Sequence, residues 1–163
     1  MSGGPFPNFC AVLRILAALT LAPPLGERAG VGYSRPMQAL LLVFVGAGLG
    51  GVLRHVVALA LARAVGNDFP YGILFINVTG SFVMGLLVGW LALRAGEGWT
   101  RQAQLFVATG ILGGYTTFST FSLDSFRLIE RGHYGMACLY ILGSVALGVA
   151  GLWAGLALVR SLT

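Results

Sequence analysis

Four apolar segments, each long enough to cross a lipid bilayer, dominate the chain from residue 37 onward. They cover residues 37–64, 71–93, 104–126 and 134–159. A spanning helix needs about 20 mostly apolar residues. Only 9% of the 163 residues are charged, against about 25% in an ordinary soluble domain. We therefore expect an all-α integral membrane protein with four transmembrane helices and no sizeable soluble domain.

Residues 1–36 do not share this pattern. Their short apolar run, residues 9–22, is broken by Arg14 and is too short to span a bilayer comfortably. Residues 1–8 carry no charge, so the segment fits a secretory signal peptide poorly. Met37 opens directly onto the first spanning segment. We predict that translation begins at Met37, that residues 1–36 are an extension with a mis-assigned start, and that residues 37–163 form the transmembrane domain.

The third segment contains a run that is unusual for a spanning helix. Residues 110–121 hold three glycines, three threonines, one serine and two phenylalanines. Glycine allows a chain to leave helical geometry, and Ser and Thr can bond the backbone groups that lose their helical partners. In lipid such a break occurs only where it is buried in protein or lines a wet cavity. We predict a break at the midplane of the membrane and an ion site beside it; the alternative is an unbroken helix whose small residues allow close packing.

The other three segments carry polar side chains at a spacing of four, which places them on one face of a helix. These stripes contain Gly46, Gly50 and Arg54, then Asn77, Ser81, Gly85 and Gly89, and finally Tyr140, Ser144 and Gly148. A cation within an apolar segment normally finds a partner, and for Arg54 we favour a structural role over direct contact with an ion. Asn77 is either a hydrogen-bonding link between helices or an N–H donor to a passing anion. Tyr140 alone is typical of an interfacial anchor.

The arginines near the segment ends fall almost equally on the two sides of the membrane. One side carries Arg94, Arg101, Arg160 and either Arg35 or a new N-terminus, and the other carries Arg63, Arg127 and Arg131. Orientation follows the side with more Lys and Arg in short loops. Because four against three is close to a tie, we expect insertion in both orientations, which allows antiparallel dimers.

Three motifs in order resemble the Fluc (CrcB) fluoride channels: residues 46–54, residues 69–72 leading into 77–82, and residues 113–121. The resemblance covers about residues 37–159. It implies that four-helix subunits assemble as antiparallel, dual-topology homodimers with two pores in the cell (inner) membrane. Such a channel lets fluoride leave the cell passively and lowers its toxic concentration in the cytoplasm.

The resemblance also implies a set of functional residues. The ion pathway would contain Asn77, Phe118, Phe121, Ser119, Thr120, Tyr140 and Ser144, and Arg54 would be the structural arginine of the first helix. The backbone carbonyls of Gly113 and Thr116 would hold a structural sodium ion, Na+, that is not transported. Two positions depart from the family pattern: Ile73 stands where the family usually has Thr, and Gly148 where it often has Ser.

The sequence offers less support for two rival functions, and for an enzyme, than for a channel. A proton-coupled small multidrug transporter needs a membrane-embedded carboxylate, and the only acidic residue in a candidate segment is Asp124, near the end of the third. Nothing specific favours a non-conducting assembly subunit. No nucleophile–base constellation or Cys/His metal spacing is present in the sequence, so an enzyme is not expected. The net charge of +5 sits mainly near segment ends, which argues against nucleic-acid binding.

Overall fold

The computed structural model describes residues 36–95 and 97–162, and every structural statement below concerns these residues. The predicted extension, residues 1–36, therefore lies outside the described part except for Pro36, and Met37 lies in the first described helix. The described residues form helices and turns, without strands. The helices are α2 (Pro36–Val65), α3 (Tyr71–Leu93), α4 (Thr100–Ala103), the π-helix η1 (Gln104–Leu112), α5 (Gly113–Tyr115), α6 (Phe118–Glu130) and α7 (Tyr134–Ser161).

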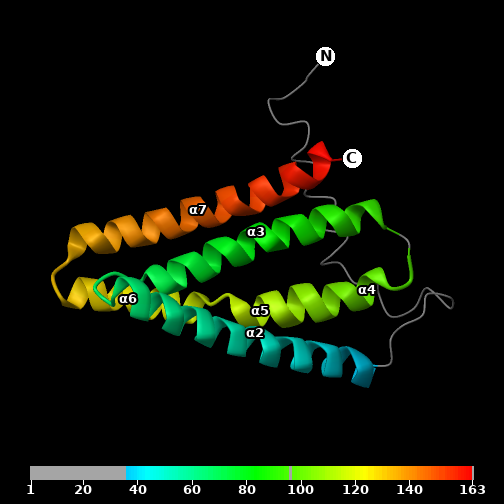
Figure 1. Ribbon diagram of the computed structural model, residues 1–163, viewed down its shortest axis with the longest axis horizontal. Helices are drawn as coiled ribbons and strands as arrows, with labels where there is room; N and C mark the ends of the chain where they lie inside the picture. The colour runs from blue at the N-terminus through cyan, green and yellow to red at the C-terminus, as the bar shows by residue number, and fades with distance from the viewer. Residues whose placement is uncertain (1–35, 96, 163) are drawn as a thin grey trace, which may run out of the picture. The chain divides into compact units, whose positions relative to one another are not determined.

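Three of these helices, α2, α3 and α7, are long and apolar enough to cross a membrane. The third predicted segment is instead divided among η1, α5 and α6, which follow one another, after the short α4, roughly end to end (Figure 1). The chain is thus an all-helical, multi-pass integral membrane protein, and its arrangement fits four membrane segments.

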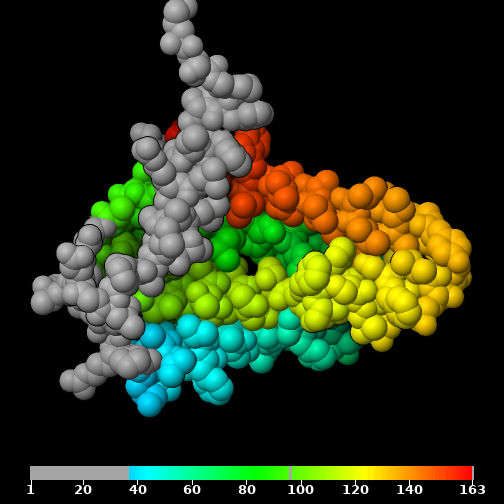
Figure 2. All heavy atoms as spheres, turned by 180° about the vertical axis from the view of Figure 1, so that it is seen from behind, coloured from blue at the N-terminus to red at the C-terminus, as the bar shows by residue number. Residues whose placement is uncertain are grey.

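The helices pack in neighbouring pairs. α3 lies along α7, while α2 lies along η1 and α5 (Figure 1). α6 packs against α7, and the two are side by side in the view from behind (Figure 2). Many large apolar side chains on α2 and α7 stay exposed, such as Phe44 and Trp153. Exposed apolar surface of this kind suits contact with lipid or with another subunit.

The backbones of α2 and η1 touch where the two helices cross. A Cβ atom on Gly46 would lie only 2.6 Å from the carbonyl oxygen of Phe106 and 2.9 Å from the Cα of Gly110. Glycine is therefore required for this approach, in the manner of small-residue packing between membrane helices. The contact fixes η1, and with it the residues that follow, against α2.

A small aromatic core ties the turn between α2 and α3 to the other helices. Gly66 begins this turn with a φ of +83°, a value that favours glycine. Phe69 then packs edge-on against Tyr140 of α7, with ring centroids 5.6 Å apart. Leu128 of α6 and Ala137 of α7 complete the buried cluster. The core thus lies at the end of the helix bundle where α6 turns into α7.

Candidate functional site

The third segment leaves helical geometry at two threonines. Thr116 has φ −77° and ψ 157°, and Thr117 has φ −151° and ψ 122°, so both are extended. Gly113 keeps helical angles of −63° and −37°. The expectation that the glycines themselves would leave helical geometry is wrong at Gly113, because the extended conformation falls on β-branched residues, which tolerate it well. Gly110 and Gly114 of this run instead permit close approach to α2.

The side chain of Asn77 is bonded to the extended backbone through both of its polar groups. Its Nδ2 donates to the carbonyl oxygen of Thr117 at 3.1 Å, and its Oδ1 accepts from the Thr117 backbone N–H at 2.9 Å. We call this pair of bonds the Asn77 clamp. The second of these bonds satisfies a backbone N–H that the loss of helix leaves without a partner. Of the two roles considered for Asn77, the hydrogen-bonding link between helices is present in the structure.

The hydroxyl of Thr117 caps the start of α6. It accepts from the backbone N–H of Thr120 at 3.3 Å, and it lies 3.1 Å from the Thr120 hydroxyl and 3.2 Å from that of Ser119. A side-chain oxygen at this position stabilises a helix N-terminus. The positive end of the α6 dipole therefore lies beside the extended residues.

A groove of about 330 Å³ opens next to the clamp. Its walls are Asn77, Gly80, Ser81, Met84, Thr116, Thr117, Phe118, Phe121, Ser144, Val145, Gly148 and Leu152. Four predicted pathway residues, Asn77, Phe118, Phe121 and Ser144, thus line one groove. Ser119, Thr120 and Tyr140 are not among its walls. Ser81 and Thr117 also line the groove, although neither is a predicted pathway residue; for Ser81 the sequence signal is its spacing of four from Asn77.

Three aromatic rings follow one another from the groove into the core. The Phe118 and Phe121 centroids are 5.6 Å apart, and those of Phe121 and Tyr140 are 5.3 Å apart. Phe118 is 79% exposed, whereas Tyr140 is fully buried. An interfacial anchor would be partly exposed, so this alternative for Tyr140 is wrong.

Two buried hydroxyl groups on α7 have no hydrogen-bond partner among the described residues, the Tyr140 phenol and the Ser144 Oγ. Leaving a buried polar group unsatisfied costs about 1–3 kcal/mol. Buried polar groups are normally satisfied in folded proteins, so these two hydroxyls are available to bind water or an ion.

Arg54 reaches the extended residues from α2. Its Nη1 donates to the carbonyl oxygen of Thr116 at 3.4 Å, which is a long hydrogen bond. This contact agrees with a structural role for Arg54. The Gly113 carbonyl has no such donor within the described chain, because the Thr117 N–H that would serve it in a continuous helix is held by Asn77. No group of three or more His, Cys, Asp or Glu side chains suited to a metal occurs in the described residues.

Comparison with known proteins identifies the family. The family model described as "CrcB-like protein, Camphor Resistance (CrcB)" matches residues 41–156. The chain belongs to the CrcB family. The resemblance drawn from the three sequence motifs is thereby confirmed.

Similar proteins in this family are named as channels. The chain is 60% identical over 125 residues to "Fluoride-specific ion channel FluC 2" of Nitrobacter hamburgensis, covering 76% of this chain and 98% of that protein. It is 59% identical over 126 residues to a FluC of Methylobacterium nodulans and 56% identical over 123 residues to one of Rhodopseudomonas palustris, with the same two coverages. These names describe ion channels and not enzymes, which agrees with the expectation that this CrcB protein is not an enzyme.

Proposed function

We propose that this protein is a fluoride channel, which lets fluoride leave the cell passively across the cell membrane and so lowers its toxic concentration. One observation carries the proposal: relatives named fluoride-specific channels are 56–60% identical over nearly their whole length. The groove beside the Asn77 clamp supports it, because its walls combine neutral polar groups with phenylalanine rings. Family membership also leaves little support for a multidrug transporter or an assembly subunit.

The proposed ion path uses neutral donors. Fluoride is small and tightly hydrated, so a pore must replace its water with N–H and O–H groups. An amide NH₂ has two donors; one is committed to Thr117 in the Asn77 clamp, and the second is available to an anion in the groove. The hydroxyls of Ser119, Thr120, Tyr140 and Ser144 complete the proposed donor set. Phe118 and Phe121 would present the positive edges of their rings to the ion.

We further propose that two copies assemble as an antiparallel homodimer around the extended residues. Gly113 and Phe118, on either side of these residues, are exposed in the single chain. Irregular backbone does not face lipid within the hydrocarbon core, so something must cover it. A second copy related by a two-fold axis would do so with the same surface, and the near-equal arginine count allows it to insert in the opposite orientation.

Dual topology should be visible with reporters fused to the C-terminus. We expect signal from a periplasmic and from a cytoplasmic reporter at comparable levels, both in the full chain and in a variant that begins at Met37. The variant controls for any effect of residues 1–36 on orientation. A single strong orientation in both proteins would contradict the antiparallel dimer.

At the centre of such a dimer we propose a structural sodium ion held by the carbonyls of Gly113 and Thr116 from both subunits. The donor set fits, because the Gly113 oxygen lacks its helical donor and the Thr116 oxygen keeps a lone pair beside its long bond to Arg54. Bare carbonyl oxygens are suitable ligands for a hard cation. The Arg54 charge opposes a cation at this position, so the site depends on four oxygens from two copies.

The proposed function is tested by flux from proteoliposomes. We expect rapid fluoride efflux, no comparable chloride efflux and no ethidium transport. Chloride is larger and more weakly hydrated, and ethidium is a cation that the positive α6 terminus repels. Proton-dependent ethidium transport would instead show that the protein is a multidrug transporter. The absence of any flux would favour a non-conducting assembly subunit.

A further inference from the structure

One peptide unit lies between the groove and the proposed sodium ligands. It joins Thr116 to Thr117, and its carbonyl and its N–H point in opposite directions because a trans peptide is planar. Asn77 of α3 accepts from the N–H at 2.9 Å, and Arg54 of α2 donates to the carbonyl oxygen at 3.4 Å. The unit is therefore held crosswise between two helices. We call it the bridging peptide.

The bond to Asn77 sets the direction of the Thr116 carbonyl. Both threonines of the bridging peptide are extended, so the regular bonds of a helix do not hold it. At its carbonyl end the bond from Arg54 is long and therefore weak. At its N–H end the bond to the Asn77 Oδ1 has an ordinary length. The side chain that orients a proposed sodium ligand thus also lines the groove.

The amide of Asn77 can pass a change in the groove to the bridging peptide. Its Nδ2 has two hydrogens; one is donated to the Thr117 carbonyl oxygen, and the other is free to bind an anion in the groove. An anion that accepts this hydrogen moves electron density onto the Asn77 Oδ1. The Oδ1 then accepts more strongly from the Thr117 N–H, and the Thr116 carbonyl oxygen in turn becomes more negative. Successive hydrogen bonds strengthen one another in this way by roughly 10–30% per bond.

We propose that Asn77 couples the two ions, so that an anion in the groove strengthens sodium binding at the Thr116 carbonyl through the bridging peptide. Asn77 is then a positioning residue for the cation as well as a donor to the anion. Coupling between two binding sites is reciprocal, so sodium strengthens fluoride binding by the same factor. A link through two neutral amides should lie at the lower end of typical couplings, at about fivefold. This inference rests on the proposed fluoride path and sodium ion and adds the connection between them.

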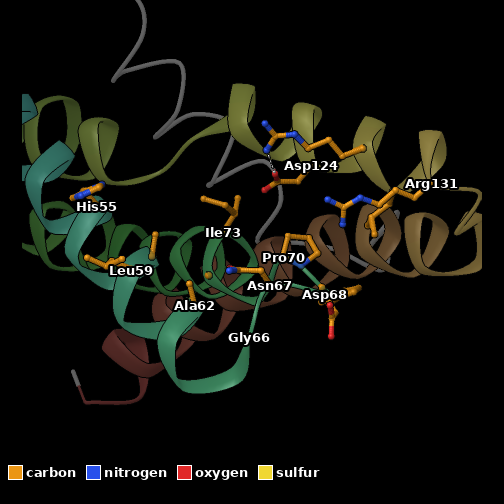
Figure 3. A pocket seen from close by; sticks show the side chains of 15 residues that line it. His55, Leu59, Ala62, Gly66, Asn67, Asp68, Pro70, Ile73, Asp124 and Arg131 are labelled. Carbon is orange, nitrogen blue, oxygen red and sulfur yellow. Dashed lines mark hydrogen bonds and ion pairs between the residues drawn. The ribbon is translucent and has the colours of Figure 1, made fainter.

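A second cavity makes no contact with this connection. It has a volume of about 430 Å³ and lies between α2, the turn that follows it and α6 (Figure 3). Its walls carry charges of both signs, including Asp124 and Arg131, and do not include Asn77 or the bridging peptide. An anion bound at Arg131 would therefore touch no member of the proposed connection. We expect Arg131→Gln to leave the coupling unchanged.

The sequence allows the bridging peptide to be observed alone. Thr116-Thr117 is the only pair of consecutive threonines in the chain. Protein grown with threonine that carries ¹³C at the carbonyl and ¹⁵N at the amide therefore contains one directly bonded labelled pair, and an HNCO spectrum shows this peptide only. With sodium present, fluoride should move its amide proton downfield, as a stronger hydrogen bond does. Chloride at the same concentration should leave it in place.

Sodium binding provides the second measurement, because an ion that binds the folded protein raises its unfolding temperature. In wild type, fluoride should lower the sodium concentration for half-maximal stabilisation about fivefold. Asn77→Leu keeps a side chain of similar size without polar groups, so this concentration should rise and fluoride should no longer change it. Direct attraction between the two ions would instead preserve the fluoride effect in this variant. If the variant fails to fold, the wild-type threonine peak decides the point.

The matched control is Tyr115→Phe, which removes a different bond between the third segment and α3. The Tyr115 hydroxyl lies 3.1 Å from that of Thr79, which donates to the Phe75 carbonyl oxygen at 2.7 Å. A threonine hydroxyl has one hydrogen, so Tyr115 donates to Thr79. The variant should lower the unfolding temperature and keep the full effect of fluoride on sodium binding, because this bond lies outside the proposed connection.

The coupling and the channel fail in different ways. A threonine peak and a sodium requirement that both ignore fluoride, in a protein that passes fluoride, would overturn the coupling and leave the channel intact. Equal fluoride effects in Asn77→Leu and Tyr115→Phe would do the same. A peak and a sodium requirement that respond to fluoride in a protein that passes none would overturn the channel and leave the coupling standing.

Discussion

Replacing Phe118 with isoleucine should reduce fluoride flux about tenfold while the protein remains folded and dimeric. Tenfold corresponds to a loss of roughly 1.4 kcal/mol at the barrier, which is the scale of an interaction between an aromatic ring edge and its neighbour. Phe118 is 79% exposed in the single chain, so shortening it removes little packing within the subunit. Fluoride flux from proteoliposomes measures the effect on the pore. Size-exclusion chromatography and thermal unfolding measure any effect on assembly and fold.

The matched control is Phe44→Ile, because Phe44 on α2 is 77% exposed and does not line the groove. We expect its flux to stay within about twofold of wild type, as exposed substitutions away from special features usually change free energies by less than about 0.5 kcal/mol. Wild-type flux in Phe118→Ile, or equal losses in both variants, would argue against a pore role for Phe118.

Complete withdrawal of sodium should abolish fluoride flux. If sodium satisfies the carbonyls of Gly113 and Thr116, its removal leaves backbone oxygens unsatisfied inside the membrane, at a cost of several kcal/mol. A change of about 2.8 kcal/mol alone corresponds to a hundredfold change in rate. Protein purified and assayed in N-methylglucamine should lose flux, and its unfolding temperature should fall. Readdition of sodium should restore both.

Variants of the two ligand positions refine this test. Thr116→Ser should keep the sodium requirement, because the proposed ligand is a backbone oxygen and serine retains the hydroxyl that bonds Leu112 at 3.0 Å. Gly113→Val is informative for a different reason. A Cβ at Gly113 would meet only the Ala108 oxygen, at 3.7 Å, within one chain. Because the single chain has room for a Cβ here, we expect Gly113→Val to lose assembly or flux chiefly through contact with a partner subunit. Full flux and an unchanged unfolding temperature without sodium would rule the ion out as an essential part.

The long helices could be predicted from the sequence with small errors. The segments expected at 37–64, 71–93 and 134–159 correspond to Pro36–Val65, Tyr71–Leu93 and Tyr134–Ser161. Apolar length determines such segments in a membrane protein, and two of the intervening turns contain a glycine with positive φ, Gly66 and Gly132.

The geometry of the third segment could not be predicted in the same way. The sequence indicated where the irregular backbone would occur, but not that threonines rather than Gly113 would become extended or that Gln104–Leu112 would form a π-helix. The Asn77 clamp depends on the register of α3 against this segment, which is a tertiary property. The cavity between α6 and the turn after α2 likewise combines side chains of α6 with a turn some 60 residues earlier, and no local pattern links the two.

The division of the third segment also has a consequence for biogenesis. Neither η1 nor α6, with 9 and 13 residues, is long enough to cross a bilayer unaided. A continuous apolar helix can move from the translocon into the lipid without contacts to other segments. This segment instead carries extended residues, and the backbone N–H and carbonyl of Thr117 are hydrogen-bonded by Asn77. Since α3 precedes it in the chain, the clamp can form as soon as the segment emerges, before α7 is synthesised. We therefore expect membrane integration of this part to be coupled to tertiary folding, so that a substitution of Asn77 in α3 acts as an insertion defect in the third segment.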